Sequence, residues 1–478
     1  MNTSSAVLGI LLVLPLSAAA AAAEAGALPD STDADRTSVS VTVYNVNLGL
    51  VRETRDLRIP AAGISTLRFM DVPSSINPTT VHLESLTSPG SLDVLEQNYE
   101  YDLISPDKLL EKYVGKEVEI VEQAEDLTAR TVRAELLSVN SGPVYRIGDR
   151  IVLGQKGKVT LPSVPPDLVP RPTLVWTLDA ARAGAQEIEV SYLTDGMSWS
   201  ADYVAVVDPD DRAAGLSGWV TVVNNSGATF RDAQLKLVAG DVRRVTPSLA
   251  EGFAQPMRVQ EMAAKRAPDF EEEAFFEYHL YTLDRPTTLK QNQTKQIGLL
   301  QAPSVPLAKR LLLVGQPYWF RSQVGTIASD QKVAVVLELK NAKEGGLGVP
   351  LPKGTVRVYK KDRSGAEQFV GEDSIDHTPK DETVKLHVGD AFDVVADRTQ
   401  TDYRAISRRQ SESAYEISIR NRKEEDVTVT VREPVGGDWE IVQSSLPWKK
   451  LDARTVEFEV PVPKGQEVKL AYRVRVRW

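Results

Sequence analysis

The sequence predicts an all-β, multi-domain protein in which immunoglobulin-like β-sandwich units are combined with a small inserted β-barrel-like domain and one short helix. Three observations lead to this prediction. Apolar and polar residues alternate with a period of two in many segments, which is the pattern of half-buried strands. Short strand-like segments are separated by Gly, Asn and Asp. A pattern of strand, Asn, loop and strand also recurs three times.

The N-terminal β domain is predicted over residues 37–104. Three valines, at positions 39, 41 and 43, alternate with small polar residues, so that one face of the predicted strand is apolar. Further strands are predicted over 48–55 and 64–69, with a turn at 61–63 between them.

Residues 105–165 are predicted to hold the helix and the small barrel-like insertion. Ser105 can cap a helix over 106–114, Pro106 suits its first turn, and Gly115 can end it. Short strand patterns follow. The Pro-rich stretch 161–172 predicts a domain boundary.

Two β-sandwich domains are predicted after this boundary, over residues 173–345 and 346–478. The recurring pattern of an apolar strand, an Asn, a polar loop and a second strand is typical of sandwich hairpins. It occurs in GWVTVVNNSGATFRDAQLKLV, VVLELKNAKEGGLGVPLPKGTVRVY and YEISIRNRKEEDVTVTVREP. Residues 243–273 lack strand alternation and are predicted to be a long mobile loop.

Composition excludes several classes of protein. The chain has 478 residues, a formal net charge of -10 and no Cys. The negative charge repels phosphate backbones, so nucleic acid is not an expected partner. The lack of Cys excludes disulfides, thiol nucleophiles and thiolate metal sites. After the N-terminal region, no stretch approaches the roughly 18 apolar residues of a spanning helix, so no integral helical membrane protein is expected.

The N-terminus predicts export. Residues 6–23 read AVLGILLVLPLSAAAAAA, an apolar segment that ends in small residues, and a polar linker follows. This pattern is typical of a signal peptide, predicted over residues 1–23 and cleaved before Glu24 or, at a second site, before Leu28. We therefore expect a location in the periplasm or on the cell surface of a bacterium.

Several segments resemble the bacterial family called domain of unknown function 4139, which is related to proteins named mucoidy inhibitor A. The resemblance covers roughly residues 40–478 and implies an exported, β-rich protein, but it supplies no established activity or catalytic residues. The segments that carry it are YLTDGMSWSADY, NNSGATFRDAQLKLVAGDV, FEYHLYTLDRP, LPKGTVRVYKKD, GEDSIDHTPKDETVKLHVGDAFDVV and YRVRVRW.

The most polar cluster lies in residues 371–382. Asp373, Asp376, His377 and Asp381 offer hard oxygen donors and one imidazole, the ligands of a divalent metal such as calcium. The competing interpretation is an ordinary turn, in which the Asp side chains accept hydrogen bonds from nearby backbone N–H groups. No cofactor other than such a metal is predicted.

Two tryptophans are candidate ligand-binding residues. Trp199 and Trp219 could present aromatic faces to sugar rings. Because both occupy alternating strand positions, the competing interpretation places them in the core of a sandwich.

The sequence favours a non-enzymatic binding protein whose partner is an envelope protein or polysaccharide. The common enzyme motifs G-x-S-x-G, G-x-x-x-x-G-K-[ST] and H-E-x-x-H are absent. One alternative is a metal-dependent or acid-base hydrolase acting on an envelope polymer. A second alternative is an outer-membrane β-barrel, because the C-terminal strand alternates and ends in Trp478.

Overall fold

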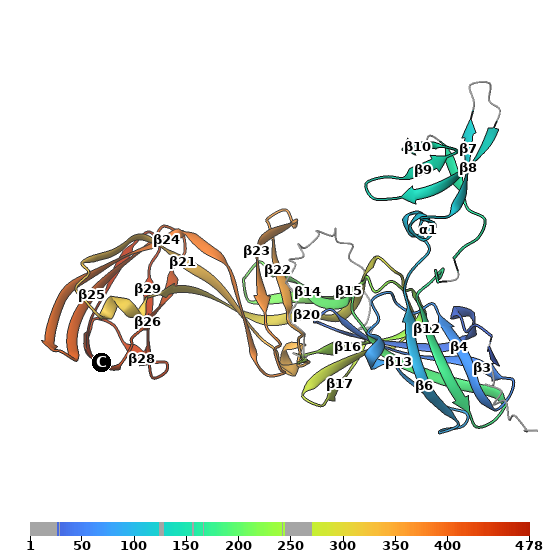
Figure 1. Cartoon of the computed structure of the whole chain (residues 1–478). Helices are drawn as coiled ribbons and strands as arrows, with labels where there is room; N and C mark the ends of the chain where they lie inside the picture. The colour runs from blue at the N-terminus through green and yellow to red at the C-terminus, as the bar shows by residue number, and fades with distance from the viewer. Residues whose placement is uncertain are drawn as a thin grey trace, which may run out of the picture. The chain divides into compact units, whose positions relative to one another are not determined.

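A computed structural model describes residues 26–27, 29–123, 129–154, 157–165, 167–240, 242–243 and 270–478. The predicted signal peptide and residues 244–269 of the predicted mobile loop lie outside the described residues. The rest of the chain is mostly strand, and its one described α-helix is α1 (Pro106–Lys112), as Figure 1 shows. The prediction of a β-rich chain with one short helix is therefore confirmed.

Two compact units divide the chain. The first comprises the described residues up to Thr37 together with Thr54–Val72 and His82–Val190; the second comprises Ser38–Glu53, Pro73–Val81 and Ser191–Trp478. The division cuts three strands, which therefore belong partly to each unit: β2 (Arg36–Tyr44), β3 (Leu48–Ile59) and β13 (Gly184–Thr194). The three alternating valines of β2 are buried, as their period of two predicts.

The first unit contains a four-stranded sheet in the order β1-β4-β12-β6. Its central strand β12 pairs along its whole length with both β4 and β6. This differs from the predicted domain start at residue 173, because the strand that follows the Pro-rich stretch joins the N-terminal strands. The bounds are β1 (Gly26–Ala27), β4 (Gly63–Met70), β6 (Leu92–Glu100) and β12 (Thr173–Ala180), with β5 (His82–Ser85) also in this unit.

Helix α1 precedes a five-stranded sheet, seen in Figure 1 as a small group of strands. Ser105 caps the helix, because its hydroxyl accepts the Lys108 N–H at 3.2 Å, and Gly115 follows it with φ 79°. Tyr113, Ile120 and Leu136 contribute to the small core of this sheet. The strand order is β10 (Arg150–Leu153), β9 (Val144–Ile147), β8 (Ala129–Ser138), β7 (Glu117–Gln123) and β11 (Lys158–Thr160).

The predicted barrel-like shape of this insertion is wrong for the described residues. Strands β10 and β11 are the two ends of the sheet and do not pair with each other, so the sheet is open. Strands of three or four residues, as in β9, β10 and β11, are too few and too short for closure by pairing.

The second unit is built around a thirteen-stranded sheet whose main path is β23-β22-β14-β15-β20-β21-β24-β25-β30-β27. Every second residue of β15 is buried, which is the pattern of a half-buried strand. The bounds are β14 (Met197–Val207), β15 (Ala213–Asn224), β20 (Gln293–Val314), β21 (Thr326–Lys340), β22 (Gly354–Lys361), β23 (Glu367–Ile375), β24 (Thr383–Ser407), β25 (Gln410–Asn421), β26 (Val427–Pro434), β27 (Asp438–Ser444), β28 (Trp448–Lys450), β29 (Thr455–Val462) and β30 (Glu467–Arg477). The predicted domains 173–345 and 346–478 thus share one sheet.

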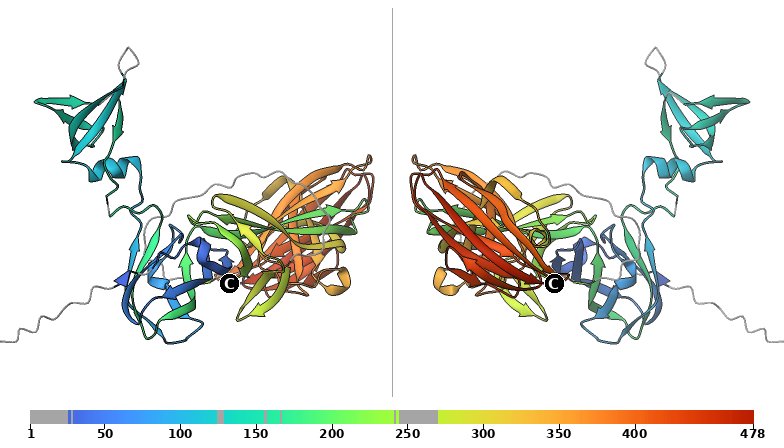
Figure 2. Two further views of the ribbon diagram at one scale, coloured as in Figure 1. Left: turned by 90° about the vertical axis from the view of Figure 1, so that its right-hand side faces the viewer. Right: turned by 90° about the vertical axis from the view of Figure 1, so that its left-hand side faces the viewer.

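Apolar side chains from two groups of strands meet in one core at the C-terminal end of this unit. Ile417 of β25 and Leu470 of β30 belong to the same buried cluster as Val431 of β26 and Phe458 of β29. Figure 2 shows the long strands of this region running side by side. The alternation that the sequence predicts for the C-terminal strand places Leu470, Tyr472, Val474 and Val476 in this core.

The second unit also contains β16 (Phe230–Ala239), β17 (Phe270–Phe275), β18 (Tyr278–Leu283) and β19 (Thr287–Leu289). Strand β18 lies between β17 and β16, and β16 pairs in parallel with β2. The predicted loop 243–273 therefore ends earlier than expected, because residues 270–273 belong to β17. These residues read FEEE, so they show no apolar-polar alternation from which the sequence could predict a strand.

The recurring Asn of the sequence pattern has one role in all three places. Asn224, Asn341 and Asn421 are buried and each follows or ends a long strand. The Nδ2 group of Asn421 donates to the carbonyls of Glu425 at 2.8 Å and Val462 at 3.1 Å, while its Oδ1 accepts the Lys423 N–H at 3.0 Å. Asn224 and Asn341 bond to their own loops in the same way. Each Asn side chain thus forms hydrogen bonds with loop backbone groups that have no partner in a neighbouring strand.

Candidate functional site

The predicted metal stretch, residues 371–382, runs from the end of β23 through a loop to the start of β24. Asp373 lies on β23, and its Oδ2 accepts the His387 N–H of β24 at 2.8 Å. Its Oδ1 accepts the neighbouring Ser374 N–H at 2.8 Å. This carboxylate therefore joins two strands through the backbone.

The other three candidates of this stretch do not converge with Asp373. His377 accepts the Lys353 N–H on Nδ1 at 3.2 Å. The Asp376 and Asp381 side chains are exposed, and Asp381 has φ 67°, a left-handed turn conformation that Asp tolerates. Within the residues that the structure describes, which include this whole stretch, no three His, Asp or Glu side chains are grouped so as to hold a metal ion. The geometry matches the competing interpretation, turn chemistry.

The two candidate tryptophans occupy neighbouring strands but differ in exposure. Trp199 of β14 is 3% exposed, its Nε1 donates to the Val238 carbonyl at 3.1 Å, and its ring lies edge-on to Tyr281. Trp219 of β15 lies opposite Asp202 and is partly exposed. Of the two rings, only that of Trp219 presents surface to the solvent.

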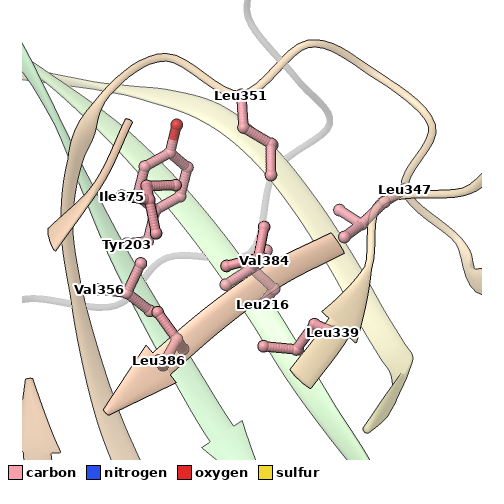
Figure 3. Close-up of a pocket in the computed structure, with 9 residues that line it drawn as sticks. All are labelled: Tyr203, Leu216, Leu339, Leu347, Leu351, Val356, Ile375, Val384 and Leu386. Atoms are coloured by element: carbon pink, nitrogen blue, oxygen red, sulfur yellow. The ribbon is translucent and has the colours of Figure 1, made fainter. Parts of the chain in front are cut away.

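An apolar cavity lies beneath the loop that connects β21 to β22. Figure 3 shows its lining side chains pointing toward a common space, with the Tyr203 ring at one side. The Tyr203 hydroxyl donates to the Pro352 carbonyl at 2.8 Å, so its polar end is satisfied. The cavity volume is about 10 Å³, which is about enough for one water molecule. It is a packing gap, and a ligand does not fit in it.

A buried ion pair is the feature that the sequence did not reveal. Arg398 of β24 and Glu433 of β26 have no solvent-exposed side-chain surface, and Nη1 of Arg398 donates to Oε1 of Glu433. The Arg398 guanidinium also lies 4.7 Å from the centre of the Trp319 ring. Gly315 is required beside the pair, because a Cβ there would collide with the Glu433 carboxylate.

Polar groups around this pair continue the network. The Tyr415 hydroxyl donates to the Trp319 carbonyl at 2.8 Å and accepts from Gln400 Nε2 at 3.2 Å. The Tyr472 hydroxyl interacts with the Glu433 carboxylate but forms no hydrogen bond of regular geometry. The buried side chains thus surround the ion pair with polar and aromatic groups.

Burial and charge shift the proton affinities of these groups. Burial raises the pKa of Tyr415 to about 12 and raises the pKa of Tyr472 well above its ordinary value. Burial is the largest single effect on Arg398 and disfavours its charged form, but the Glu433 carboxylate, together with Tyr472 and Tyr415, outweighs burial and raises the pKa of the guanidinium. The pair has no solvent-exposed side-chain surface, so we assign it a structural role. It fixes how β24 and β26 face each other across the core.

Large apolar side chains are exposed on β23 and β24, two strands that contact each other. Phe392 of β24 is 94% exposed, and Phe369 and Val370 of β23 are also exposed. Phe369 contacts Tyr359 edge-on with ring centres 5.6 Å apart. The two strands approach closely at Gly371, where a Cβ would collide with the Val388 carbonyl. We call Phe369, Val370 and Phe392 the β23 surface.

The fold defines a mostly-β protein with an extended sheet in its second unit, and no helix of the described chain is both long and apolar enough to cross a bilayer. Residues 188–478 match the family described as Domain of unknown function (DUF4139), and the chain belongs to this family. The match confirms the resemblance seen in the sequence and extends from β13 to the C-terminal strand. A search of curated proteins finds no match.

Proposed function

We propose that this protein is exported to the envelope of a bacterium, where it acts as a non-enzymatic binding protein for an envelope protein or polysaccharide. The observation that carries the proposal is the β23 surface, with Phe392 94% exposed. Singly exposed apolar residues are common, but three that project from two adjoining strands are typical of an interaction surface. Burying one such phenylalanine in a complex contributes about 1.5 to 3 kcal/mol.

The organisation of residues 371–382 supports binding over reaction. Asp373 and His377 accept backbone N–H groups, so the most polar part of the sequence serves to hold β23 and the following loop in place. This scaffold lies directly beside the β23 surface along the chain. A rigid strand that presents apolar side chains loses little conformational entropy when a partner binds.

An immunoglobulin-like sandwich is the architecture that we infer for the C-terminal region. The shared core of β25, β30, β26 and β29 supports it, since two facing layers of strands with one apolar interior are the basis of a sandwich. In such folds, hairpins and loops outside the core carry the binding residues.

Co-sedimentation with washed envelope from the native host tests the proposed binding. The full chain should sediment with this material, and Phe369→Ser combined with Phe392→Ser should lower the bound fraction by about tenfold. Leu153→Ser is the matched control, because Leu153 is an exposed apolar residue of the first unit. Equal sedimentation of the double variant and the wild type would contradict the proposal.

N-terminal sequencing of the protein recovered from its native host tests export. The apolar segment at residues 6–23 supports a mature chain that begins near Glu24 or Leu28. Recovery of an intact Met1 from the cytosol would contradict this part of the proposal.

A further inference from the structure

Four arginines that form no ion pair with any described residue gather at one end of the second unit. Arg408 and Arg409 form the turn between β24 and β25, Arg477 lies opposite Gln410, and Arg321 lies 5.0 Å from the centre of the Trp478 ring. The Trp478 N–H donates to the Arg409 carbonyl at 2.8 Å, which brings the four together. We call this group the arginine end.

The arginine end differs from the neighbouring charged residues. On the same strand, Arg473 pairs with Asp402 and Arg475 pairs with Glu412. All four arginines of the arginine end are exposed, and in the described chain none forms an ion pair, although Asp438 is the cross-strand neighbour of Arg477. This is a local excess of positive charge on a chain whose net charge is -10.

The hairpin of β17 and β18 carries the opposite charge. Glu271, Glu273 and Glu277 are exposed, and no ion pair involves them in the described chain, whereas Glu272 is used locally, 2.7 Å from His279. Glu271 and Glu273 project from the same face of β17 as Phe275, because they are two residues apart.

Aromatic residues occupy the tip of this hairpin. Phe275 is exposed and Phe276 is 84% exposed. Phe276 also has φ 56°, a left-handed conformation that is strained for a bulky residue. We call Glu271, Glu273, Phe275, Phe276 and Glu277 the acidic hairpin.

We propose that the acidic hairpin of one copy of this chain binds the arginine end of a second copy. The two surfaces match in charge, and they also match in a second respect: arginine guanidinium groups pack on phenylalanine faces. Arginine and aromatic residues are the types most enriched at the centres of protein interfaces. An anionic polymer would neutralise the arginines, but it would leave both phenylalanines exposed, so a second copy accounts for more of the structure.

The contact joins two different surfaces, so it is heterologous. A bound pair still has one free acidic hairpin, on one copy, and one free arginine end, on the other, and copies therefore add head to tail into a ring or a filament. Because both surfaces are exposed and charged, association weakens as salt screens them.

Light scattering on the full chain, over a range of protein concentrations and at low salt, tests this proposal. The wild type should associate, and about 0.5 M salt should weaken association by about tenfold or more. Glu271→Lys with Glu273→Lys and Glu277→Lys gives the first charge-reversed variant, and Arg408→Glu with Arg409→Glu gives the second. Each alone should be monomeric, because its two surfaces then carry the same sign.

The decisive experiment is to mix the two charge-reversed variants. In the mixture, each hairpin again faces an oppositely charged end, so association should return. Phe276→Gly is the variant that spares folding, since Gly favours a positive φ, and it should weaken association without lowering the melting temperature. A mixture that stays monomeric would overturn the proposal, as would a monomeric wild type that binds dextran sulfate through Arg408 and Arg409.

Discussion

Two polar regions of the second unit, residues 371–382 and the Arg398–Glu433 network, are built in opposite ways. The first is a dense run of charged residues in sequence, and the structure leaves Asp376 and Asp381 in solvent. The second draws Arg398, Glu433 and Tyr472 from three strands and removes them from solvent completely or almost completely. Residues 371–382 are easily recognised in the sequence as a charged segment. The Arg398–Glu433 network, whose members are far apart in the sequence, is recognised only in the structure.

The difference follows from the cost of burying charge. Several charges on one short segment repel one another and need water, so such a segment becomes a loop whose side chains accept local N–H groups. A buried charge requires an opposite charge from a different strand, and that strand is distant in sequence. The density of charge along the chain is therefore a poor guide to where charge matters most for stability.

Removing one member of the buried pair is expected to have the largest effect. Arg398→Met leaves the Glu433 carboxylate buried without its partner, which should lower the free energy of unfolding by about 3 to 5 kcal/mol. Urea denaturation followed by circular dichroism measures the loss. Arg398→Met together with Glu433→Met should recover much of it, because no uncompensated charge remains.

Arg420→Met is the surface control for this comparison. Arg420 pairs with Asp397 and Asp330 at the protein surface, so its loss should cost less than about 1 kcal/mol. If Arg398→Met and Arg420→Met lowered the free energy of unfolding equally, burial would not distinguish the two ion pairs.

The buried asparagines should give the next largest effect. Asn421→Ala removes the side-chain bonds to the Glu425, Val462 and Lys423 backbones, and the free energy of unfolding should fall by about 1 to 3 kcal/mol. Thermal unfolding measures the change. Asn140→Ala, at an exposed turn residue, should change stability by less than about 0.5 kcal/mol; a comparable loss there would contradict this account.

Within residues 371–382, Asp373 should matter more than its exposed neighbours. Asp373→Ala removes the bond to the His387 N–H and should cost about 0.5 to 1.5 kcal/mol. Asp376→Ala should cost less than about 0.5 kcal/mol, because the Asp376 side chain is exposed and its bond to the Thr378 hydroxyl uses the backbone carbonyl. Chemical denaturation of both variants checks the order, and the reverse order would contradict the assigned contacts.

A smaller, pH-dependent effect is expected at Asp362, in the turn between β22 and β23. Hydrogen bonds from Ser364 and Gln368 lower the pKa of this carboxyl to about 2. A folded pKa below the unfolded value contributes stability above about pH 4, and this is lost as the pH falls through about 2. Melting temperatures between pH 5 and pH 2 should therefore fall less steeply for Asp362→Asn than for the wild type. If the melting temperatures of the two proteins fell in parallel with pH, Asp362 would not contribute to the pH dependence of stability.

Local patterns in the sequence predicted the secondary structure well. The alternating valines of β2 and the Ser105 cap of α1 are confirmed, because each depends on residues close together in the chain. Strand pairing was harder to predict. That β12 joins β4 and β6, and that one sheet runs through both predicted sandwich domains, depends on contacts between distant segments.

The candidate site shows the same limit. The sequence identified the hydrogen-bonding potential of Asp373 and His377 but could not decide whether their partners were metal or backbone. It gave no sign of the Arg398–Glu433 pair, because no spacing rule connects residues on separate strands. The one local irregularity is that Glu433 falls in phase with Val429 and Val431 of β26, at a position where the alternation predicts an apolar residue.

A calcium and a manganese titration of the wild type, followed by melting temperature, tests most directly whether residues 371–382 are scaffold. A ligand that binds only the folded state raises the melting temperature by mass action. The account predicts no ion-dependent rise for the wild type or for Asp373→Ala and His377→Ala, although both variants melt at a lower temperature. A rise in the wild type that disappears in both variants would contradict the account and establish a metal site.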